Sequence, residues 1–379
     1  MSDTEDANGG NADGGDPDED DPRLCDFCRL PISKGRVTMN GDGITYEFCS
    51  ETCREAMADN ERVFTEYHGH RRIRTGVSGL DAFLPQGFPR NSFVLLSNDE
   101  GVRDDAVLAE LVWRALERDE PAVIVTFTEP PVSVVERFLS LDWNLLPYLE
   151  AGQLHVVDCF TYRVSDRDRM FERMNEWNRH IYRFTREVTE TVRDPSDVAE
   201  VQNKLDSCLE ALEMSDRGVV AVDSLTEFGT LVQPVQAYDF VKDVRADVCK
   251  GRFVPVFAGA TITGDEKTFP HDLGYAVDGL VDLQTNGSIV KDTLIKRVRI
   301  RKMNGVLSIP EWTAYEFTAG KGLVTFDPIA EMSDTYEGGG REGSDDQRNG
   351  EDERPRDQQS GTTGDPRQGP EQSSEVERE

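Results

Sequence analysis

From residue 71 onward, short apolar runs alternate with segments of helical periodicity, and no other feature of the sequence constrains the fold as strongly. Strands that alternate with helices form parallel sheets, because each helix carries the chain back to the same edge. The runs are short, apolar and β-branched, as strands covered on both faces should be. They span residues 93–97, 122–126, 154–157, 219–222 and 254–258. The sequence therefore predicts an α/β domain over residues 69–331, with a mostly parallel sheet and flanking helices.

Four of the seven cysteines fall in one short segment and indicate a separate small module. They are spaced C-x2-C-x20-C-x3-C, at Cys25, Cys28, Cys49 and Cys53. Two close pairs can each place both thiolates on one metal ion, and the residues between them suffice for a hairpin that returns the second pair. The NGDG of residues 40–43 is a turn signal, and a helix is expected from Ser50. The pattern predicts a zinc site made of four thiolates.

Residues 24–66 resemble the TRASH treble-clef family and the related zinc-binding ribosomal large-subunit proteins, through CxFC, a glycine-containing turn and FCSxxC. We therefore expect a treble-clef zinc finger over residues 24–68, with no ligand position left for a catalytic water. Two disulfides are the alternative, but a chain without an export signal meets reducing conditions. TRASH relatives are often discussed as metal sensors, so reversible sensing stays open beside structural zinc. His68 and His70 could be spare ligands, and we interpret them as linker.

The segment RIRTGVSGLDAFLPQGFP resembles the KaiC and RadA branch of the RecA-like ATPases, whose pattern is R-x-x-TG-x-x-GLD-x-x-L-x-x-G-x-P. Further matches are TFTEPP around Glu129, GVVAVDSLTEF with Asp223 at a strand end, and RIRKMNG with Lys302. The resemblance covers about residues 71–330 and implies a RecA-like fold. It also implies that Asp223 stands at the magnesium-site position and Glu129 at that of the catalytic base.

The phosphate loop of this family, G-x-x-x-x-G-K-[ST], is replaced here by NDEGVRDD. Asn98 and Arg103 stand at the two glycine positions, Asp104 at the lysine and Asp105 at the Ser/Thr. The motif needs glycines that let backbone N–H groups surround the phosphates, a lysine that neutralises them and a hydroxyl that holds magnesium. The loop carries four acids: Asp99, Glu100, Asp104 and Asp105. Each would repel a triphosphate by on the order of 1 to 4 kcal/mol.

The K-x-R pair with which this family contacts the γ-phosphate of a neighbouring subunit reads Lys302-Met303-Asn304 here. The loss of its arginine agrees with the loss of the phosphate loop. An Asp at the end of a central strand can cap the next helix, and DSLTE fits such a cap, so Asp223 needs no catalytic role. We assign no catalytic residue, and Glu129 and Asp223 bind a cofactor only if magnesium or a nucleotide is present.

These observations predict a non-catalytic, KaiC-like regulatory or scaffold protein that binds zinc and acts through protein partners or homo-oligomers. The expected cofactor is zinc, and the sequence does not favour ATP. One alternative is an ATP-binding signalling ATPase of the RecA/KaiC type. The other is a metal-sensing or DNA-associated accessory regulator.

About 60 residues separate the strand that ends near Asp158 from the one that ends at Asp223, more than a single helix needs. A first apolar stripe, spaced by fours and threes, predicts a helix of about six turns. It consists of Met170, Met174, Trp177, Ile181, Phe184, Val188 and Thr191 or Val192. A second stripe follows Pro195 and consists of Val198, Val201, Leu205, Cys208 or Leu209, and Leu212. We expect an antiparallel helical hairpin inserted at about 163–214, either packed on the domain or used as a partner-binding or dimerisation arm.

The formal net charge of −31 is spread unevenly. Residues 1–23 and 332–379 each carry −8 and almost no large apolar side chains, so both are predicted to be disordered acidic tails. Residues 24–331 keep −15, and only 9 of the 42 basic residues are lysine. Such a surface suits a salt-rich cytosol, where screening removes self-repulsion, so we expect a haloarchaeal protein. An acidic mesophilic protein is the alternative.

The acidic balance excludes a nucleic-acid-binding protein of the usual basic kind. Basic clusters occur at 71–74 and 296–302, and in a strand one face of the second would present Arg297, Arg299 and Arg301. The long-range field would still repel phosphate except at high salt, where such contacts weaken, so we expect no nucleic-acid partner. No run approaches the ~18 apolar residues of a membrane span, and the N-terminus does not resemble a signal peptide. We expect a soluble, cytoplasmic protein.

The remaining cysteines and histidines indicate no chemistry. Cys159, Cys208 and Cys249 stand in apolar surroundings, where buried and inert thiols are expected. The histidines of the large domain, His155, His180 and His271, are scattered. None has a serine or cysteine nucleophile at a suggestive spacing, so no hydrolase triad is predicted.

Overall fold

The computed structural model describes residues 23–28, 30–32, 35–41, 44–59, 71–99, 102, 104–164, 166–262, 271–290 and 293–328. Apart from Arg23, the two predicted acidic tails lie outside these residues, as do His68, His70, Glu100 and Arg103. The described residues form a small N-terminal module and a large α/β unit, and each is described by itself. None of the helices in the described ranges has the length and apolar character needed to cross a bilayer.

The N-terminal module consists of a β-hairpin and one helix: β1 (Val37–Gly41), β2 (Ile44–Phe48) and α1 (Glu51–Asp59). The two strands pair antiparallel. Ser50 precedes α1 and its Oγ accepts the N–H of Cys53 at 3.2 Å, which is a typical N-cap. In the described part of the module only Cys25, Phe48 and Met57 are buried. So small an apolar core does not hold a fold by itself.

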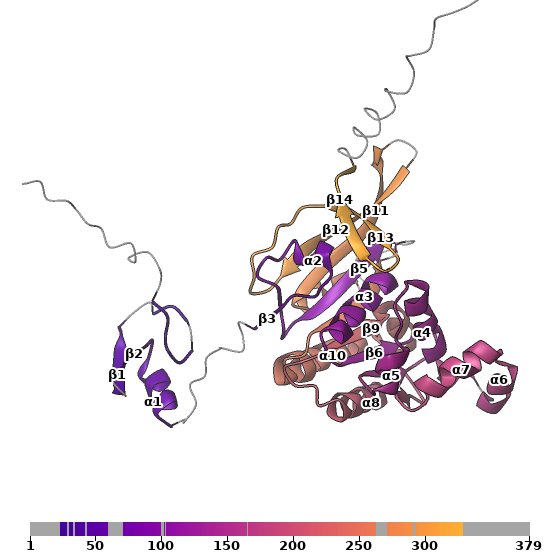
Figure 1. Ribbon diagram of the computed structural model, residues 1–379, viewed down its shortest axis with the longest axis horizontal. Coiled ribbons are helices and arrows are strands. Elements are labelled where there is room, and N and C mark those ends of the chain that lie inside the picture. The colour runs from indigo at the N-terminus through magenta and orange to yellow at the C-terminus, as the bar shows by residue number, and fades with distance from the viewer. Residues whose placement is uncertain are drawn as a thin grey trace, which may run out of the picture. The chain divides into compact units, whose positions relative to one another are not determined.

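The large unit contains a ten-stranded sheet in the order β14-β13-β12-β11-β5-β10-β9-β6-β7-β8. Pairing is parallel from β11 through β8 and antiparallel from β11 through β14. The strands are β5 (Phe93–Asp99), β6 (Ala122–Thr126), β7 (Leu154–Asp158), β8 (Thr189–Thr191), β9 (Val219–Asp223), β10 (Val256–Ile262), β11 (Gly279–Val290), β12 (Thr293–Met303), β13 (Thr313–Thr318) and β14 (Gly322–Phe326). A separate short pair is formed by β3 (Arg72–Ile73) and β4 (Phe88–Pro89). The antiparallel strands stand at one end of the sheet in Figure 1.

All five predicted strands are present, as β5, β6, β7, β9 and β10, and the mostly parallel sheet is confirmed. β10 begins two residues later than predicted, directly after Pro255. Proline has no N–H with which to join the ladder, so a strand begins after it more readily than it runs through it.

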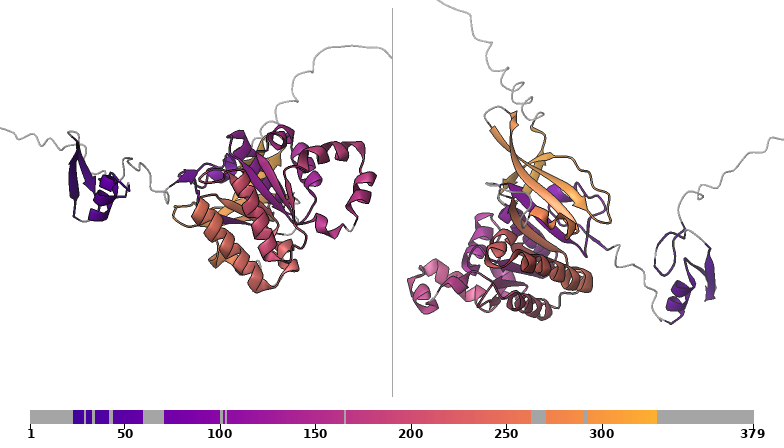
Figure 2. Two further views of the ribbon diagram at one scale, coloured as in Figure 1. Left: turned by 90° about the horizontal axis from the view of Figure 1, so that it is seen from below. Right: turned by 180° about the vertical axis from the view of Figure 1, so that it is seen from behind.

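Helices cover both faces of the sheet. The helices of the large unit are α2 (Ser78–Asp81), α3 (Asp104–Glu117), α4 (Pro131–Ser140), α5 (Leu146–Glu150), α6 (Arg167–Arg173), α7 (Glu176–Thr185), α8 (Val198–Ala211), α9 (Leu225–Leu231) and α10 (Pro234–Val244), with the 3₁₀ helices η2 (Thr161–Arg163) and η4 (His271–Tyr275) and the π-helix η3 (Arg245–Gly251). Side chains of α3, α4, α5 and α7 join one apolar core, and those of α8, α9 and α10 join the other. Figure 2 shows helix ribbons on both sides of the sheet. Alternate strand residues supply the two cores, since Val94 and Leu96 face the first while Phe93 and Leu95 face the second.

The insertion differs from the expected helical hairpin. The first stripe does not form one helix, because the chain breaks between α6 and α7 at Asn175, whose side chain accepts the N–H of Asn178 at 2.7 Å. Beyond α7, the end of the same stripe is not helical, because Thr189–Thr191 form the edge strand β8 and pair in parallel with β7. The second helix, α8, is confirmed with Asp197 as its N-cap. Because α7 and α8 contribute to different cores, they pack on opposite faces of the sheet.

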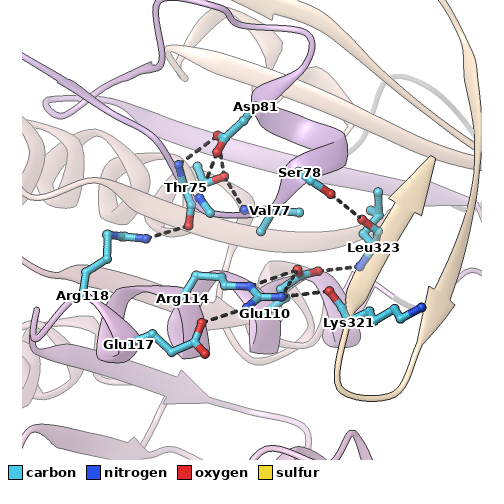
Figure 3. A network of polar contacts seen from close by, with 11 residues as sticks. Thr75, Val77, Ser78, Asp81, Glu110, Arg114, Glu117, Arg118, Lys321 and Leu323 are labelled. Carbon is cyan, nitrogen blue, oxygen red and sulfur yellow. Dashed lines mark hydrogen bonds and ion pairs between the residues drawn. The ribbon is translucent and has the colours of Figure 1, made fainter.

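A polar network ties α3 to the C-terminal strand (Figure 3). The Glu110 side chain is 1% exposed and accepts the N–H of Leu323 at 2.7 Å. Arg114 lies 3.4 Å from the same carboxylate and also donates to the carbonyl of Lys321 at 2.8 Å. Burial raises the pKa of the Glu110 carboxyl to about 7, although the Leu323 N–H and Arg114 both lower it.

Figure 3 also shows how hydrogen bonds to Asp81 hold the TG-x-x-GLD segment together. The Asp81 carboxylate accepts both the N–H and the hydroxyl of Thr75, at 2.9 and 2.8 Å, and the N–H of Gly76 at 2.9 Å. The segment therefore closes on itself as a compact turn in front of β5, and Arg118 of the α3 C-terminus donates to the Thr75 carbonyl.

Candidate functional site

The four predicted metal ligands come together in the N-terminal module. Cys25 and Cys28 lie before β1, Cys49 directly follows β2, and Cys53 lies in the first turn of α1. Their Sγ atoms all lie within 4.8 Å of one another, and Cys49 Sγ is 3.6 Å from both Cys28 Sγ and Cys53 Sγ. Zinc bound by four thiolates at about 2.3 Å in a tetrahedron separates the sulfurs by about 3.8 Å, so the cluster has the size of a zinc site.

Backbone groups hold this cluster in shape. The Asp26 carboxylate accepts the N–H of Glu47 at 2.6 Å, and the Asp26 N–H donates to the Glu47 carbonyl at 2.8 Å. The loop before β1 is thereby fixed to the end of β2. Burial by itself would raise the pKa of the Cys25 thiol, but the N–H groups of Cys28, Cys49 and Phe27 point at the sulfur and lower the pKa to about 7. Such donors stabilise the thiolate that a metal requires.

The second candidate site lies at the carboxyl ends of β6 and β9 in the large unit. Asp223 is the last residue of β9 and pairs across the sheet with Thr126, the last residue of β6. Glu129 follows β6 by three residues, and Asp105 lies in the first turn of α3, the helix that follows β5. The structure thus brings together the two carboxylates that the resemblance singled out, with a third from the altered phosphate loop. This edge of an open α/β sheet is where ligands bind.

A guanidinium from α4 lies among these three carboxylates. Arg137 Nη2 contacts Glu129 Oε1 and lies 2.8 Å from Asp223 Oδ2, and its Nε is 3.6 Å from Asp105 Oδ2. The Thr128 hydroxyl donates to the same Asp223 oxygen at 3.1 Å. The Arg137 side chain is 12% exposed and that of Asp223 10%. A nearly buried cation therefore lies among the three carboxylates.

The charges at this site balance one another only in part. Burial raises the pKa of the Glu129 carboxyl, the Arg137 cation lowers it, and the nearby carboxylates of Asp223 and Asp105 raise it again, with a net rise. Burial lowers the pKa of Arg137, but the surrounding carboxylates outweigh this and raise it. The arginine accordingly stays charged.

Sequence reasoning missed Arg137, although a signal was present. The helix PVSVVERFLS is apolar along the face formed by Val134, Val135 and Phe138, and all three side chains are buried. A basic residue next to such a face must find an acidic partner inside the protein or extend to solvent. The partner cannot be identified without the tertiary structure.

The role expected for Asp223 as a helix cap is wrong. The N-cap of α9 is Ser224, whose hydroxyl accepts the N–H of Glu227, while Asp223 points to Arg137. In the altered phosphate loop, Asn98 is buried and its Nδ2 donates to the Val102 carbonyl at 3.0 Å. Asp105, expected to repel phosphate, is instead turned towards Arg137.

The other residues singled out from the sequence serve the fold. Lys302 Nζ donates to the carbonyls of Gly274 and Val277, both at 2.8 Å, and so holds η4 against β12. The Asn304 N–H donates to the Asp278 carbonyl at 2.9 Å. Cys159, Cys208 and Cys249 are buried, and burial raises the pKa of all three thiols, that of Cys208 to about 12.

The predicted alternation along β12 is confirmed. Val298 and Ile300 are buried, while Arg299 and Arg301 reach Asp282 Oδ2 and Oδ1 at 2.9 and 2.8 Å on the other face. Arg297 and Arg299 also lie over the ring of Trp312. Among the described histidines, His155 is half-buried with a pKa lowered by burial, and His180 stacks beside Trp177 and Phe184.

Comparison with known proteins finds relatives of the large unit. The KaiC ATPase family model matches residues 73–328, which leaves the cysteine module outside the match. A UPF0273 protein of Pyrococcus furiosus is 24% identical over 274 residues, covering 70% of this chain and 99% of its own length. A UPF0273 protein of Methanopyrus kandleri is 31% identical over 155 residues, covering 41% of this chain and 54% of its own length. A solved KaiC-like protein of Pyrococcus horikoshii is 18% identical, with a TM-score of 0.49, and the match covers 68% of this chain and 99% of that one. By the extent of the family match, the chain belongs to the KaiC ATPase family.

Proposed function

We propose that this KaiC-family protein has no ATPase activity and acts as a regulatory or scaffold protein through protein contacts. One observation carries the proposal: the Arg137 guanidinium lies among Asp223, Glu129 and Asp105, and so takes the place of a metal ion. Magnesium binds through carboxylate oxygens, and the Asp223 oxygen that faces the site already accepts from Arg137 and Thr128. A metal ion can enter only if the guanidinium leaves.

The free energy favours the arrangement in which Arg137 stays among the three carboxylates. Hydrogen bonds to charged groups contribute roughly 1.5 to 3 kcal/mol each, and leaving a buried charge without its partner costs about 3 to 5 kcal/mol. A nucleotide would have to offset these terms without the lysine of a phosphate loop, because Asp104 stands at that position. ATP hydrolysis depends almost entirely on positioning and charge stabilisation, which this centre does not supply.

Calorimetry on the full-length protein tests this proposal. The protein is titrated with a non-hydrolysable ATP analogue and magnesium chloride in molar KCl, and we expect no binding up to millimolar concentration. Arg137→Gln should not restore binding, since the lysine is still missing. Magnesium-dependent binding at micromolar concentration that is lost in Asp223→Ala would refute the proposal and favour a signalling ATPase.

We further propose that the four cysteines hold a structural zinc ion. Four thiolates fill the tetrahedron and leave no position for a water or a substrate. The apolar core of the module is very small, so the metal would supply much of its folding free energy. Competition with a chelator of known affinity distinguishes structural zinc from reversible metal sensing. A dissociation constant below nanomolar fits structural zinc, and one far weaker than nanomolar fits reversible sensing.

A further inference from the structure

A cleft lined by arginines lies beside the insertion, between η2, α6 and the start of α7. Its volume is about 710 Å³, within the range of roughly 300–1,000 Å³ that is usual for small-molecule sites. It opens beyond the carboxyl end of β7, on the edge of the sheet at which α/β proteins bind ligands. The α6 and α7 ribbons project beside α4 and α5 in Figure 1.

The lining of this cleft is cationic in a strongly acidic chain. Arg163, Arg169 and Arg173 face it, and Asp166 is the only acidic residue among the lining residues. Arg163 is paired with Glu227 of α9. Arg169 and Arg173 are exposed and form no ion pair with any residue that the structure describes. Together with the single carboxylate of Asp166, these two guanidiniums leave a positive balance on one concave surface, and a cleft concentrates that field, which attracts anions.

The remaining lining residues add amide and apolar groups. Asn175 and Asn178 line the cleft, and Asn178 Oδ1 is buried without a hydrogen-bond partner among the described residues. Met170 and Met174 line both this cleft and a narrower cavity of about 100 Å³, which continues to Tyr182 and the first turn of α4. Methionine side chains adapt to apolar groups of varied shape. The cleft thus has a charged outer part, and the Met170 and Met174 side chains lie further in. The narrower cavity beyond them is lined by polar residues, among them Asp158 and Thr161, as well as by apolar ones.

We propose that this cleft binds a small phosphate or carboxylate anion carried on a compact apolar group. The oxyanion lies between Arg169 and Arg173, because guanidinium groups match the geometry of planar or tetrahedral oxyanions. The apolar group lies against Met170 and Met174. This site uses none of the residues around Arg137. The proposal for the cleft therefore does not depend on whether Arg137 prevents nucleotide binding.

Methyl spectra of the full-length protein test this site directly. The chain has eight methionines, and their ¹³C-labelled methyl groups are followed while phenyl phosphate is added in the KCl concentration that keeps the protein folded. We expect saturable shifts at Met170 and Met174, identified with single Met→Leu variants. Inorganic phosphate should bind at least fivefold more weakly, because it lacks the apolar group. Phenylsuccinate, compared with phenyl phosphate, shows which oxyanion the cleft prefers.

Variants of exposed arginines distinguish binding in this cleft from the non-specific attraction of an anion to any surface arginine. The Arg169→Gln/Arg173→Gln pair should weaken phenyl phosphate binding at least tenfold. Arg217→Gln removes an exposed arginine elsewhere and should leave the affinity unchanged. The proposal is overturned if neither phenyl phosphate nor phenylsuccinate shifts Met170 and Met174, or if the arginine pair binds both compounds as well as the parent protein does.

Discussion

Arg137 Nη2 lies 2.8 Å from Asp223 Oδ2, so the carboxylate that ends β9 is neutralised by a side chain of α4. The same guanidinium contacts Glu129. A guanidinium and a divalent cation compete for these oxygens, because each needs the same lone pairs. The proposed lack of ATPase activity therefore depends on the guanidinium keeping its place among these carboxylates.

Replacing Arg137 by methionine should expose this competition. Arg137→Met keeps most of the apolar stem but leaves Asp223, Glu129 and Asp105 without their cation. We expect the free energy of unfolding to fall by about 3 to 5 kcal/mol. Millimolar Mn²⁺ should recover part of this loss, because carboxylate oxygens are its preferred ligands. Urea unfolding with and without MnCl₂ measures both effects.

Arg163→Met is the matched control, since its ion pair with Glu227 is exposed and contributes at most about 1 kcal/mol. Its stability should not respond to Mn²⁺ more than that of the parent protein. An Arg137→Met protein as stable as the parent, or one that responds to Mn²⁺ no more than Arg163→Met, would contradict the role assigned to the guanidinium.

The buried Glu110 should make stability depend on pH. Its pKa in the folded protein is about 7, above the ordinary value of 4.5, so the folded state binds the proton more tightly than the unfolded state. The free energy of unfolding should therefore fall as the pH rises from about 4.5 to 7 and level off above that. A pKa unit corresponds to 1.36 kcal/mol, so the rise from 4.5 to about 7 makes the loss on the order of 3 kcal/mol. Glu110→Gln should remove this slope, as measured by urea unfolding at pH 5 and pH 8.

The control for this slope is Glu117→Gln. Glu117 pairs with the same Arg114, but its side chain is 41% exposed. Its substitution should leave the pH dependence of the parent protein in place. Equal slopes in Glu110→Gln and the parent protein would show that burial of this carboxyl does not control the stability.

Two glycines of the β13–β14 turn should differ in their tolerance of a side chain. Gly322 has φ of +84°, and a Cβ there would lie 2.1 Å from Oε1 of Glu110. Gly320 has φ of +75° with no atom within 4 Å of such a Cβ. Gly320→Ala should lower the free energy of unfolding by about 1 to 2 kcal/mol through backbone strain alone. Gly322→Ala should lower it by roughly 1 to 3 kcal/mol more, through overpacking. Thermal unfolding measures the stability of both variants. Equal losses of stability would exclude a clash between the new Cβ at position 322 and the Glu110 carboxylate.

Removing one thiol should abolish metal binding by the N-terminal module. We expect about one zinc ion per chain in the parent protein and close to none in Cys28→Ser or Cys49→Ser, because a three-thiolate site loses much of its affinity. Cys208→Ala removes a thiol that is buried in the large unit and should retain the zinc. Metal content after gel filtration measures the difference, and full zinc occupancy in Cys28→Ser would exclude the four-thiolate site.

Local patterns were sufficient to predict most of the fold. Apolar β-branched runs predicted five of the strands, β5, β6, β7, β9 and β10, because strands buried on both faces must be apolar throughout. The spacing of Cys25, Cys28, Cys49 and Cys53 predicted their cluster, because a hairpin of that length brings the pairs together. The single long helix of the insertion was wrong, because Asn175 caps a new helix within an uninterrupted apolar pattern. The apolar spacing continues across Asn175 and therefore does not reveal that one helix ends and another begins there.

What the sequence alone determined is the class of the sheet, the cysteine cluster and the replacement of the phosphate-loop residues by Asn98, Arg103, Asp104 and Asp105, since each depends on residues close together in the chain. Only the tertiary structure decided which cation lies among the carboxylates beyond the ends of β6 and β9. Asp105 lies in α3, Glu129 in the loop after β6, Arg137 in α4 and Asp223 at the end of β9. The family resemblance placed the three carboxylates near one site, but nothing in the local sequence of Arg137 indicates that it meets them. A charge balance is a property of distances in space, and the packing of α4 against α3 and the sheet sets those distances.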